Sequence, residues 1–355
     1  MKTITLAQHK HDLLHKGMVI PAHPLALDAQ RHLDEDRQRM LTRYYIAAGA
    51  GGVAVGVHST QFAIRNPGIG LFERVLRLAA EEVDRSEAAG HFLKIAGICG
   101  DLEQAVGEAQ TAYQLGYDMG LLSMGGLQGW DETQLLERTA AVAQHIPVFG
   151  FYLQPSVGGR VFSYDFWTKF IEIPNVLAIK VAAFNRYQTL DVMRAACFAK
   201  KDIALYTGND DNIVADLLTD YTFEVEGRPV RKHFVGGLLG HWGVWTHCAV
   251  SLLEQIKYCR ASGFREMDRL LQLGVQVTDM NAAIFDPAHD FQGCIPGIHE
   301  ILRRQGLLQG VWCLDPGEKL SPGQDTEISR VCGNYPNLVD DDFVVDFFGN
   351  QYSSS

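Results

Sequence analysis

The sequence predicts a (β/α)8 barrel followed by a helical C-terminal extension. Two observations indicate this fold: eight short apolar runs typical of strands, and a helical segment after each, with successive units about 25–40 residues apart. A doubly wound open sheet is the alternative, but no Gly-x-Gly-x-x-Gly motif follows the first predicted strand. We therefore expect a leader over residues 1–16, a barrel over 17–260, and a helical extension with a tail over 261–355.

The predicted strands are apolar runs bounded by polar residues or glycine, as expected for strands of a parallel sheet that is covered on both faces. They cover residues 18–24, 52–57, 94–99, 119–123, 147–153, 175–185, 203–207 and 233–239. An insertion at 219–232, between the seventh helix and the eighth strand, suggests a β-hairpin.

The predicted helices show apolar residues at helical spacing, and several begin at a capping residue. Asp101 is a candidate N-cap, and Asp131 with Gln134 has the spacing of a capping box. The predicted helices cover 34–48, 71–83, 101–116, the segment after Asp131, 163–171, 190–199, 212–218 and a segment ending near Tyr258. Beyond the barrel, 264–285 and 297–304 are also predicted to be helical.

Composition excludes several classes of partner. A formal net charge of −11 argues against binding to nucleic acid or to an anionic membrane, because both favour basic surfaces. No apolar run is long enough to cross a bilayer, and the first residues contain no apolar signal core. Seven scattered cysteines without a Cys-x-x-Cys pair are typical of reduced thiols, so we expect a cytoplasmic protein.

The sixth predicted strand contains a lysine, Lys180, in the middle of its apolar run. A buried lysine is unfavourable when charged, so its pKa falls and the neutral amine becomes a nucleophile toward carbonyl groups. The alternative is a lysine near a strand end that extends to solvent or pairs with a carboxylate. The remainder of the chain must decide between these interpretations.

In a barrel of this kind, the active site lies at the carboxyl ends of the strands. The fifth strand ends at Tyr152 and Gln154, and it neighbours the strand of Lys180. A phenol beside a neutral lysine is a plausible proton shuttle, although a buried tyrosine bonded to a backbone carbonyl is an equally common arrangement. The other candidates at strand ends are His23, His58, Ser59, Thr60, Asn209–Asp211 and His241.

Three segments resemble a known family of class I aldolases. GGVAVGVHSTQF, FGFYLQPSVGG and NVLAIKVA follow the order and spacing of the dihydrodipicolinate synthase / N-acetylneuraminate lyase family. The spacing from Tyr152 to Lys180 is the most specific part of the resemblance, which covers roughly residues 17–260 with a weaker echo in GIHEILRRQGLL.

The resemblance implies a Schiff-base lyase or aldolase, or a dehydratase, that acts on a 2-oxo acid such as pyruvate or on a sugar-acid derivative. It implies that Lys180 forms the imine, that Tyr152 is the acid/base, and that Ser59 with N–H groups of its turn holds the carboxylate. His58, Thr60, Gln154, Arg160, Asn209 and His241 are the further expected substrate contacts. It implies no cofactor beyond the lysine, and we expect a homo-oligomer, a dimer or a tetramer.

The sequence also departs from the family pattern, so we do not expect the synthase itself. His58 replaces the first hydroxyl of the family's paired-hydroxyl turn. SMGGLQG stands where the synthases carry a tyrosine pair that links subunits. Val157 stands where they place an arginine for a second carboxylate, with Arg160 nearby as a substitute. The departures predict a retained imine chemistry with an altered substrate pocket.

Two other functions compete with this interpretation. A metal enzyme would use His23, His58 and His241 at the tops of neighbouring strands, with Asp210 or Asp211 beside them. No His-x-His or His-Glu-x-x-His motif supports that site, and we expect no metal. A barrel that only binds an oxo acid is the second alternative, but a pure binding protein has no need for a desolvated amine.

Overall fold

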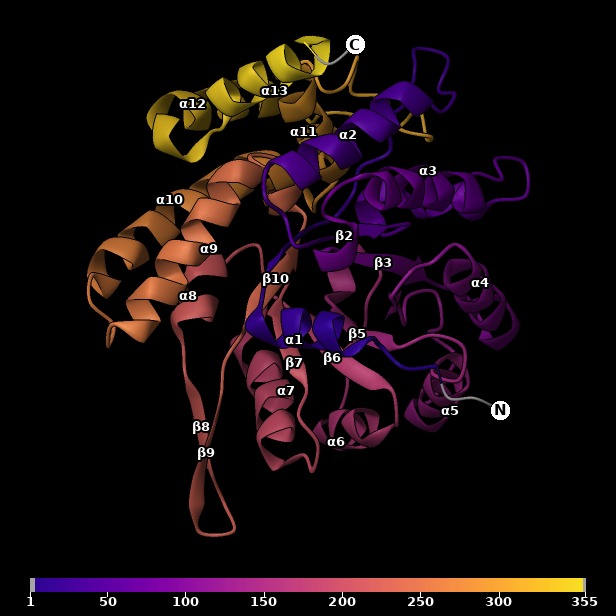
Figure 1. Cartoon of the computed structure of the whole chain (residues 1–355), viewed down its shortest axis with the longest axis vertical. Helices are drawn as coiled ribbons and strands as arrows, with labels where there is room; N and C mark the ends of the chain where they lie inside the picture. The colour runs from indigo at the N-terminus through magenta and orange to yellow at the C-terminus, as the bar shows by residue number, and fades with distance from the viewer. Residues whose placement is uncertain (1–3, 354–355) are drawn as a thin grey trace.

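The eight predicted strands form one parallel sheet that curves into a barrel (Figure 1). The computed structural model describes residues 4–353, and within them the strand order is β1-β10-β7-β6-β5-β4-β3-β2. A bridge between Ala22 and Ala54 joins the first strand to the second and brings the sheet close to closure. The strands are β1 (Val19–Pro21), β2 (Gly52–Val55), β3 (Leu93–Ile98), β4 (Met119–Leu122), β5 (Val148–Leu153), β6 (Val176–Ala182), β7 (Ala204–Thr207) and β10 (Gly236–Leu239).

Helices connect the strands and cover the outside of the barrel, so the predicted fold class is confirmed. Asp101 and Asp131 cap their helices as predicted, and Asp131 forms a capping box with Gln134. The barrel helices are α2 (Glu35–Ala47), α3 (Phe72–Arg85), α4 (Leu102–Gln114), α5 (Glu132–Val142), α6 (Tyr164–Glu172), α7 (Arg186–Phe198), α8 (Ile213–Leu218) and α9 (Thr246–Ala261).

The strands separate two apolar cores because successive side chains of a strand point to opposite faces. Alternate residues such as Phe149, Phe151 and Ala178 fill the barrel interior. The residues between them, such as Tyr152 and Ile179, pack outward against the helices. The face on which a strand residue lies therefore decides whether it can reach an interior site.

The residues of the expected leader include a helix, α1 (Gln8–Lys16), that lies in front of the barrel in Figure 1. Leu14 of α1 is fully buried and belongs to the interior core. The Tyr206 hydroxyl donates a hydrogen bond of 2.7 Å to the Leu14 carbonyl oxygen. This helix therefore packs on the amino-terminal end of the strands, away from the expected active-site end.

The predicted hairpin at 219–232 is confirmed as the antiparallel pair β8 (Tyr221–Val225) and β9 (Arg228–Lys232). In Figure 1 this hairpin projects away from the barrel. It follows α8, whose fully buried Asp216 accepts hydrogen bonds from Thr207 and Asn209 at the end of β7.

The C-terminal extension consists of α10 (Met267–Phe285), α11 (Cys294–Arg304), α12 (Gln324–Asn334) and α13 (Asp341–Ser353). It contacts the barrel through Asp340, which accepts a hydrogen bond of 2.6 Å from the Tyr44 hydroxyl of α2. Within the extension, Asp340 also accepts a hydrogen bond of 2.8 Å from Gln305. Figure 1 shows α11, α12 and α13 gathered beside α2. Among the described residues, no helix is long and apolar enough to cross a membrane.

Candidate active site

Lys180 lies in β6 with its side chain inside the barrel, and the residue is only 8% exposed. Its Nζ atom stands 4.4 Å from the centre of the Phe151 ring, and within residues 4–353 the amine has no hydrogen bond or ion pair. Gly208 leaves room for it, because a Cβ atom there would come within 2.5 Å of the lysine Cε. Burial lowers the pKa of Lys180 to about 8, against an opposing effect from the Asp210 charge.

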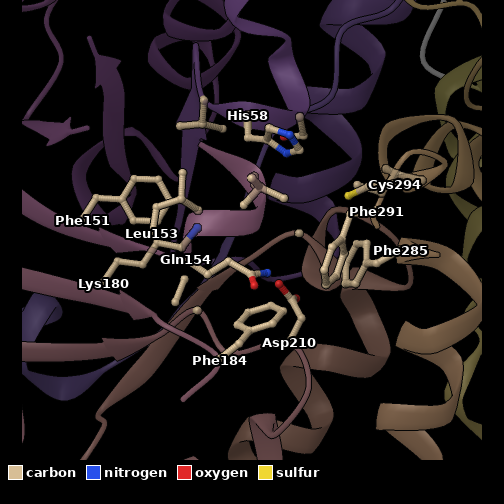
Figure 2. A pocket seen from close by; sticks show the side chains of 18 residues that line it. His58, Phe151, Leu153, Gln154, Lys180, Phe184, Asp210, Phe285, Phe291 and Cys294 are labelled. Atoms are coloured by element: carbon tan, nitrogen blue, oxygen red, sulfur yellow. The ribbon is translucent and has the colours of Figure 1, made fainter. Parts of the chain in front are cut away.

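A partly enclosed cavity surrounds this amine (Figure 2). Its empty volume, including the open mouth, is about 660 Å³. The cavity is lined by Ala22, Val57, His58, Ser59, Phe151, Leu153, Gln154, Val157, Lys180, Ala182, Phe184, Gly208, Asp210, Gly240, Phe285, Phe291, Cys294 and Ile298. Of the predicted site residues, Lys180, His58, Ser59 and Gln154 line it.

Asp210 is the second charged group of the cavity, and it follows β7. The backbone N–H of His241 donates a hydrogen bond of 3.1 Å to one of its oxygens, which orients the carboxyl group. Burial raises the pKa of Asp210 to about 7, although the nearby Lys180 charge opposes the shift. The carboxyl group therefore holds a proton over part of the neutral pH range.

His58 and Ser59 form the side of the cavity next to β2. Burial, with a smaller contribution from the Lys180 charge, lowers the pKa of His58 to about 4, so the imidazole is neutral near pH 7. Ser59 is 3% exposed, and its hydroxyl donates a hydrogen bond of 3.2 Å to the His23 carbonyl oxygen. Its oxygen remains able to accept or exchange a hydrogen bond with a bound ligand.

The expectation that Tyr152 shares the interior volume with Lys180 is wrong. In the parallel pairing of β5 with β6, Lys180 stands opposite Phe151, and Tyr152 stands opposite Val181. Tyr152 therefore faces the helix layer, where its ring packs 4.9 Å from the Trp167 ring. Its hydroxyl accepts a long hydrogen bond of 3.4 Å from the Phe162 N–H.

We expect the Tyr152→Phe variant to retain its turnover to within about threefold. The hydroxyl lies on the face away from the amine, and its loss should cost only about 0.5–1.5 kcal/mol of stability. Steady-state kinetics and thermal unfolding check this. Phe151→Leu, the matched change on the inner face, removes the ring beside Lys180 and should lower turnover more. A hundredfold loss in Tyr152→Phe with an intact fold would contradict this placement.

Thr60 and His23 are structural and do not line the cavity. The Thr60 hydroxyl accepts hydrogen bonds from the N–H groups of Gly56 and Val57 and donates one of 2.7 Å to the His23 carbonyl. The His23 ring bonds the Pro24 carbonyl and the Thr42 hydroxyl, at 2.8 and 2.9 Å. Both side chains therefore hold the ends of β1 and β2 together.

Asn209, Arg160 and His241 also differ from their predicted role as substrate contacts. Asn209 is fully buried, and its side chain bonds the Phe184 N–H at 2.9 Å and Asp216 at 2.8 Å. The Arg160 guanidinium donates to the backbone carbonyls of Leu127 and Trp130 at 3.2 and 2.7 Å. The His241 ring packs on Trp245, and only its backbone reaches the site, through Asp210. Asn209 and Arg160 hold loop backbone, and none of the three side chains lines the cavity.

The predicted metal alternative has no support in the geometry of the histidines. The His23 ring faces Thr42 and Gln38 of α2, while His58 lines the cavity and His241 packs on Trp245. Among the residues that the structure describes, no three histidine, cysteine or acidic side chains are grouped closely enough to hold a metal ion.

Sequence reasoning missed the aromatic side of the cavity. Phe285, Phe291, Cys294 and Ile298 come from the C-terminal extension, far along the chain from the strand ends. Phe151 and Phe184 belong to the predicted β5 and β6 regions, but nothing in those apolar runs distinguishes an inward side chain from an outward one. Their contribution is a consequence of strand register and of how α11 packs.

Acid should destabilise the protein steeply because burial lowers the pKa of several histidines, four of them strongly. Burial lowers the pKa of His23, His58, His241 and His299 to about 4. Between about pH 6.5 and 4, the unfolded chain binds protons that these folded residues exclude, so stability falls as pH falls. Asp210 acts oppositely, since its raised pKa lets the folded state keep a proton. With both effects included, the free energy of unfolding should fall by about 4 kcal/mol for each pH unit near pH 5.

Thermal unfolding at intervals from pH 7.5 to 4.5 checks this slope. His299→Phe removes one of the groups that bind a proton on unfolding, so it should reduce the slope by about 1.4 kcal/mol per pH unit. The matched variant His32→Phe, at a side chain that is 79% exposed, should leave it unchanged. A flat profile across this range would show that the buried histidines titrate normally.

Comparisons with known proteins match the fold of this chain to two groups of enzymes. No protein-family model and no curated protein matches the sequence. An N-acetylneuraminate lyase from Fusobacterium nucleatum complexed with pyruvate is 17% identical, with a TM-score of 0.70 over 93% of this chain and 99% of that chain. A dihydrodipicolinate synthase from Aquifex aeolicus is 17% identical, with a TM-score of 0.71 over 91% and 99%. A third, a dihydrodipicolinate synthase from Agrobacterium tumefaciens, is 18% identical, with a TM-score of 0.70 over 91% and 99%. At these identities, the likeness establishes the fold.

Proposed function

We propose, on the fold that this chain shares with those lyases and synthases, that it is a Schiff-base-forming lyase acting on a 2-oxo acid. One observation carries the proposal: a buried lysine amine with no hydrogen bond or ion pair among the described residues lies in a cavity at the barrel centre. An amine whose pKa is lowered to about 8 is substantially neutral at slightly alkaline pH. The pyruvate complex of the Fusobacterium enzyme supports a 2-oxo acid as the ligand class.

Imine formation requires a nucleophile and a proton source, and the cavity provides both. The neutral Lys180 amine adds to the C2 carbonyl carbon of the oxo acid, and the resulting carbinolamine loses its hydroxyl as water. That hydroxyl must receive a proton as it leaves, and Asp210, with a pKa raised to about 7, is the acid available in the same cavity. Phe151 occupies the position beside the amine and has no proton to offer.

The substrate carboxylate needs hydrogen-bond donors on the opposite side of C2. Ser59 lines the cavity next to β2, and its hydroxyl can turn from the His23 carbonyl to a ligand oxygen. The neutral His58 imidazole beside it provides a second donor or acceptor, depending on its tautomer. This places the carboxylate toward β2 and leaves the remainder of the substrate directed toward the C-terminal helices.

The imine then serves as an electron sink for a change at the next carbon atoms. In a cleavage, the C3–C4 bond breaks, its electron pair moves into the enamine, and the C4 hydroxyl gives up its proton as the aldehyde forms. Protonation of C3 and hydrolysis of the imine release pyruvate and the free amine. Asp210, which lines the same cavity, is the group that we propose receives and returns these protons.

Reductive trapping tests the proposal directly. Borohydride added with pyruvate should reduce the imine and increase the mass of the peptide containing Lys180 by that of the reduced adduct. Borohydride without an oxo acid, and acetone in place of the oxo acid, are the controls for nonspecific reduction and for the carboxylate requirement. An adduct on another lysine, or no adduct with any of a panel of 2-oxo acids, would rule out this function.

A further inference from the structure

From the walls of the cavity we infer that the substrate carries an apolar group on the carbon that leaves as the aldehyde. This inference deepens the proposed function and rests on it. The reaction would then join or separate pyruvate and an aromatic or branched aliphatic aldehyde.

The end of the cavity that faces the C-terminal extension is lined mainly by apolar side chains, with the Asp210 carboxyl and the Gln154 amide beside them (Figure 2). Phe285 at the end of α10, Phe291 in the following loop, and Ile298 in α11 all line it. In Figure 2 the rings of Phe285 and Phe291 lie across the cavity from the Lys180 side chain, with Phe184 below them. A ligand bound to Lys180 with its carboxylate toward Ser59 would extend toward these rings.

Charge in the cavity disfavours a second anionic group on the substrate. Lys180 and Asp210 are the charged side chains among the lining residues, and the positive charge of the protonated imine on Lys180 is already balanced by the substrate's own carboxylate. Arg160, the substitute that the sequence suggested for an anion-binding arginine, is bonded to the carbonyls of Leu127 and Trp130. A second carboxylate or a phosphate would therefore be desolvated beside Asp210 with no further counter-charge among the lining residues, which is strongly unfavourable.

A polyhydroxylated group also lacks partners at this end. Beyond Asp210 and Gln154, the side chains facing the C-terminal extension are phenylalanine, isoleucine and the weakly polar thiol of Cys294. Asn209, which lies next along the chain, is already committed to the Phe184 N–H and to Asp216. Sugar hydroxyls placed here would lose their hydrogen bonds to water without replacing most of them.

The backbone keeps two of these rings in place at an energetic cost. Phe184 has a φ of 50° and Phe291 a φ of 64°, in the left-handed region that is unfavourable for a bulky side chain. Their rings meet edge to face, with centroids 6.1 Å apart. Strained backbone of this kind persists where the surrounding structure holds it, and it clusters at ligand sites. The surrounding structure therefore holds these two rings in a strained conformation, in an aromatic wall that the barrel fold itself does not require.

A panel of aldehydes condensed with pyruvate tests the inference. The probes are benzaldehyde as the aromatic member, glyceraldehyde as the hydroxylated member, and succinic semialdehyde as the acidic member. We expect kcat/KM for benzaldehyde to exceed the other two by at least about tenfold, as is typical when an apolar pocket receives an apolar group. In each reaction the enamine carbon of pyruvate attacks the aldehyde carbon, the aldehyde oxygen takes a proton, and water releases the 4-hydroxy-2-oxo acid from the lysine.

Matched variants connect the preference to the aromatic wall. Phe291→Asn removes the ring, and asparagine tolerates a left-handed backbone, so the loop conformation is retained. This variant should lower kcat/KM for benzaldehyde at least about tenfold. The ratio of kcat/KM for benzaldehyde to kcat/KM for glyceraldehyde should therefore fall. Phe264→Asn is the control, because Phe264 has a similar φ of 63° but packs against Arg260 outside the cavity. This control should leave both values unchanged.

The outcomes separate this inference from the proposed function. If pyruvate is trapped on Lys180 but glyceraldehyde or succinic semialdehyde is the preferred aldehyde, the inference of an apolar substrate is wrong. The proposed imine chemistry would still hold. Failure of the trap itself would overturn the proposed function. An unchanged preference in Phe291→Asn, with an intact fold and an effective trap, would show that the aromatic wall does not select the aldehyde.

Discussion

The Lys180→Met variant is expected to lose turnover by at least about 10⁴-fold and, at the same time, to become more stable. Methionine is similar in length, so the barrel packing is kept while the nucleophile disappears. Lys180 is 8% exposed and the pKa of its amine is lowered by burial, so its charged form opposes folding at neutral pH. Its removal should stabilise the fold by about 1–3 kcal/mol. Steady-state kinetics and denaturant unfolding measure the two effects.

The combination of lost activity and increased stability distinguishes a functional lysine from a structural one. Lys94→Met is the matched control, since Lys94 is another buried strand lysine but is paired with Asp84. That variant should lose stability and keep most of its turnover. If Lys180→Met were destabilised like Lys94→Met, the buried amine would have a structural partner that the described residues do not show.

The Asp210→Asn variant is expected to lose about 10²- to 10⁴-fold in turnover, the usual contribution of a general acid or base. Asparagine preserves the shape and the acceptor for the His241 N–H, so positioning is retained. Asp211→Asn is the matched control, because Asp211 is exposed and does not line the cavity. A loss shared equally by the two variants would indicate a general charge effect of this loop rather than proton transfer.

The pH dependence of Asp210→Asn provides a second readout. The carboxylate charge raises the pKa of Lys180, so its removal should lower that pKa, and the rise of trapping rate with pH should shift to lower pH. In the unmodified protein the profile of kcat/KM should be bell-shaped, with limbs that belong to the coupled pair near the values of about 7 and about 8. A variant profile shifted to higher pH would contradict the assigned interaction.

Most of the barrel could be predicted from the sequence because its signals are local. Each strand is a short apolar run, and helix starts such as Asp101 and Asp131 are capped by the side chains that the spacing suggests. The lysine was found for the same reason, since a charged residue inside an apolar run is anomalous wherever the run is buried. Those inferences depend on neighbours within a few residues.

The orientation of Tyr152 could not be predicted because the fifth strand shows no polar alternation. The run FGFYL is apolar or aromatic on both faces, so the period of two that would separate interior from exterior is absent. The register that pairs Phe151 with Lys180 determines which ring faces the barrel interior. A shift of one residue in this register would turn Tyr152 inward and Phe151 outward. Tyr152 and Lys180 therefore have the spacing of the family along the chain, but their side chains point to opposite faces of the sheet.

The barrel, the hairpin at 219–232 and the buried Lys180 can be predicted from local patterns, because periodicity, turns and an isolated charge are properties of contiguous residues. The groups that surround that lysine depend on long-range packing. Asp210 reaches it from the next strand, and Phe285, Phe291 and Cys294 reach the same cavity from the C-terminal extension. Such contacts follow from sheet register and from how helices pack on the barrel, and both arise between segments far apart in the chain.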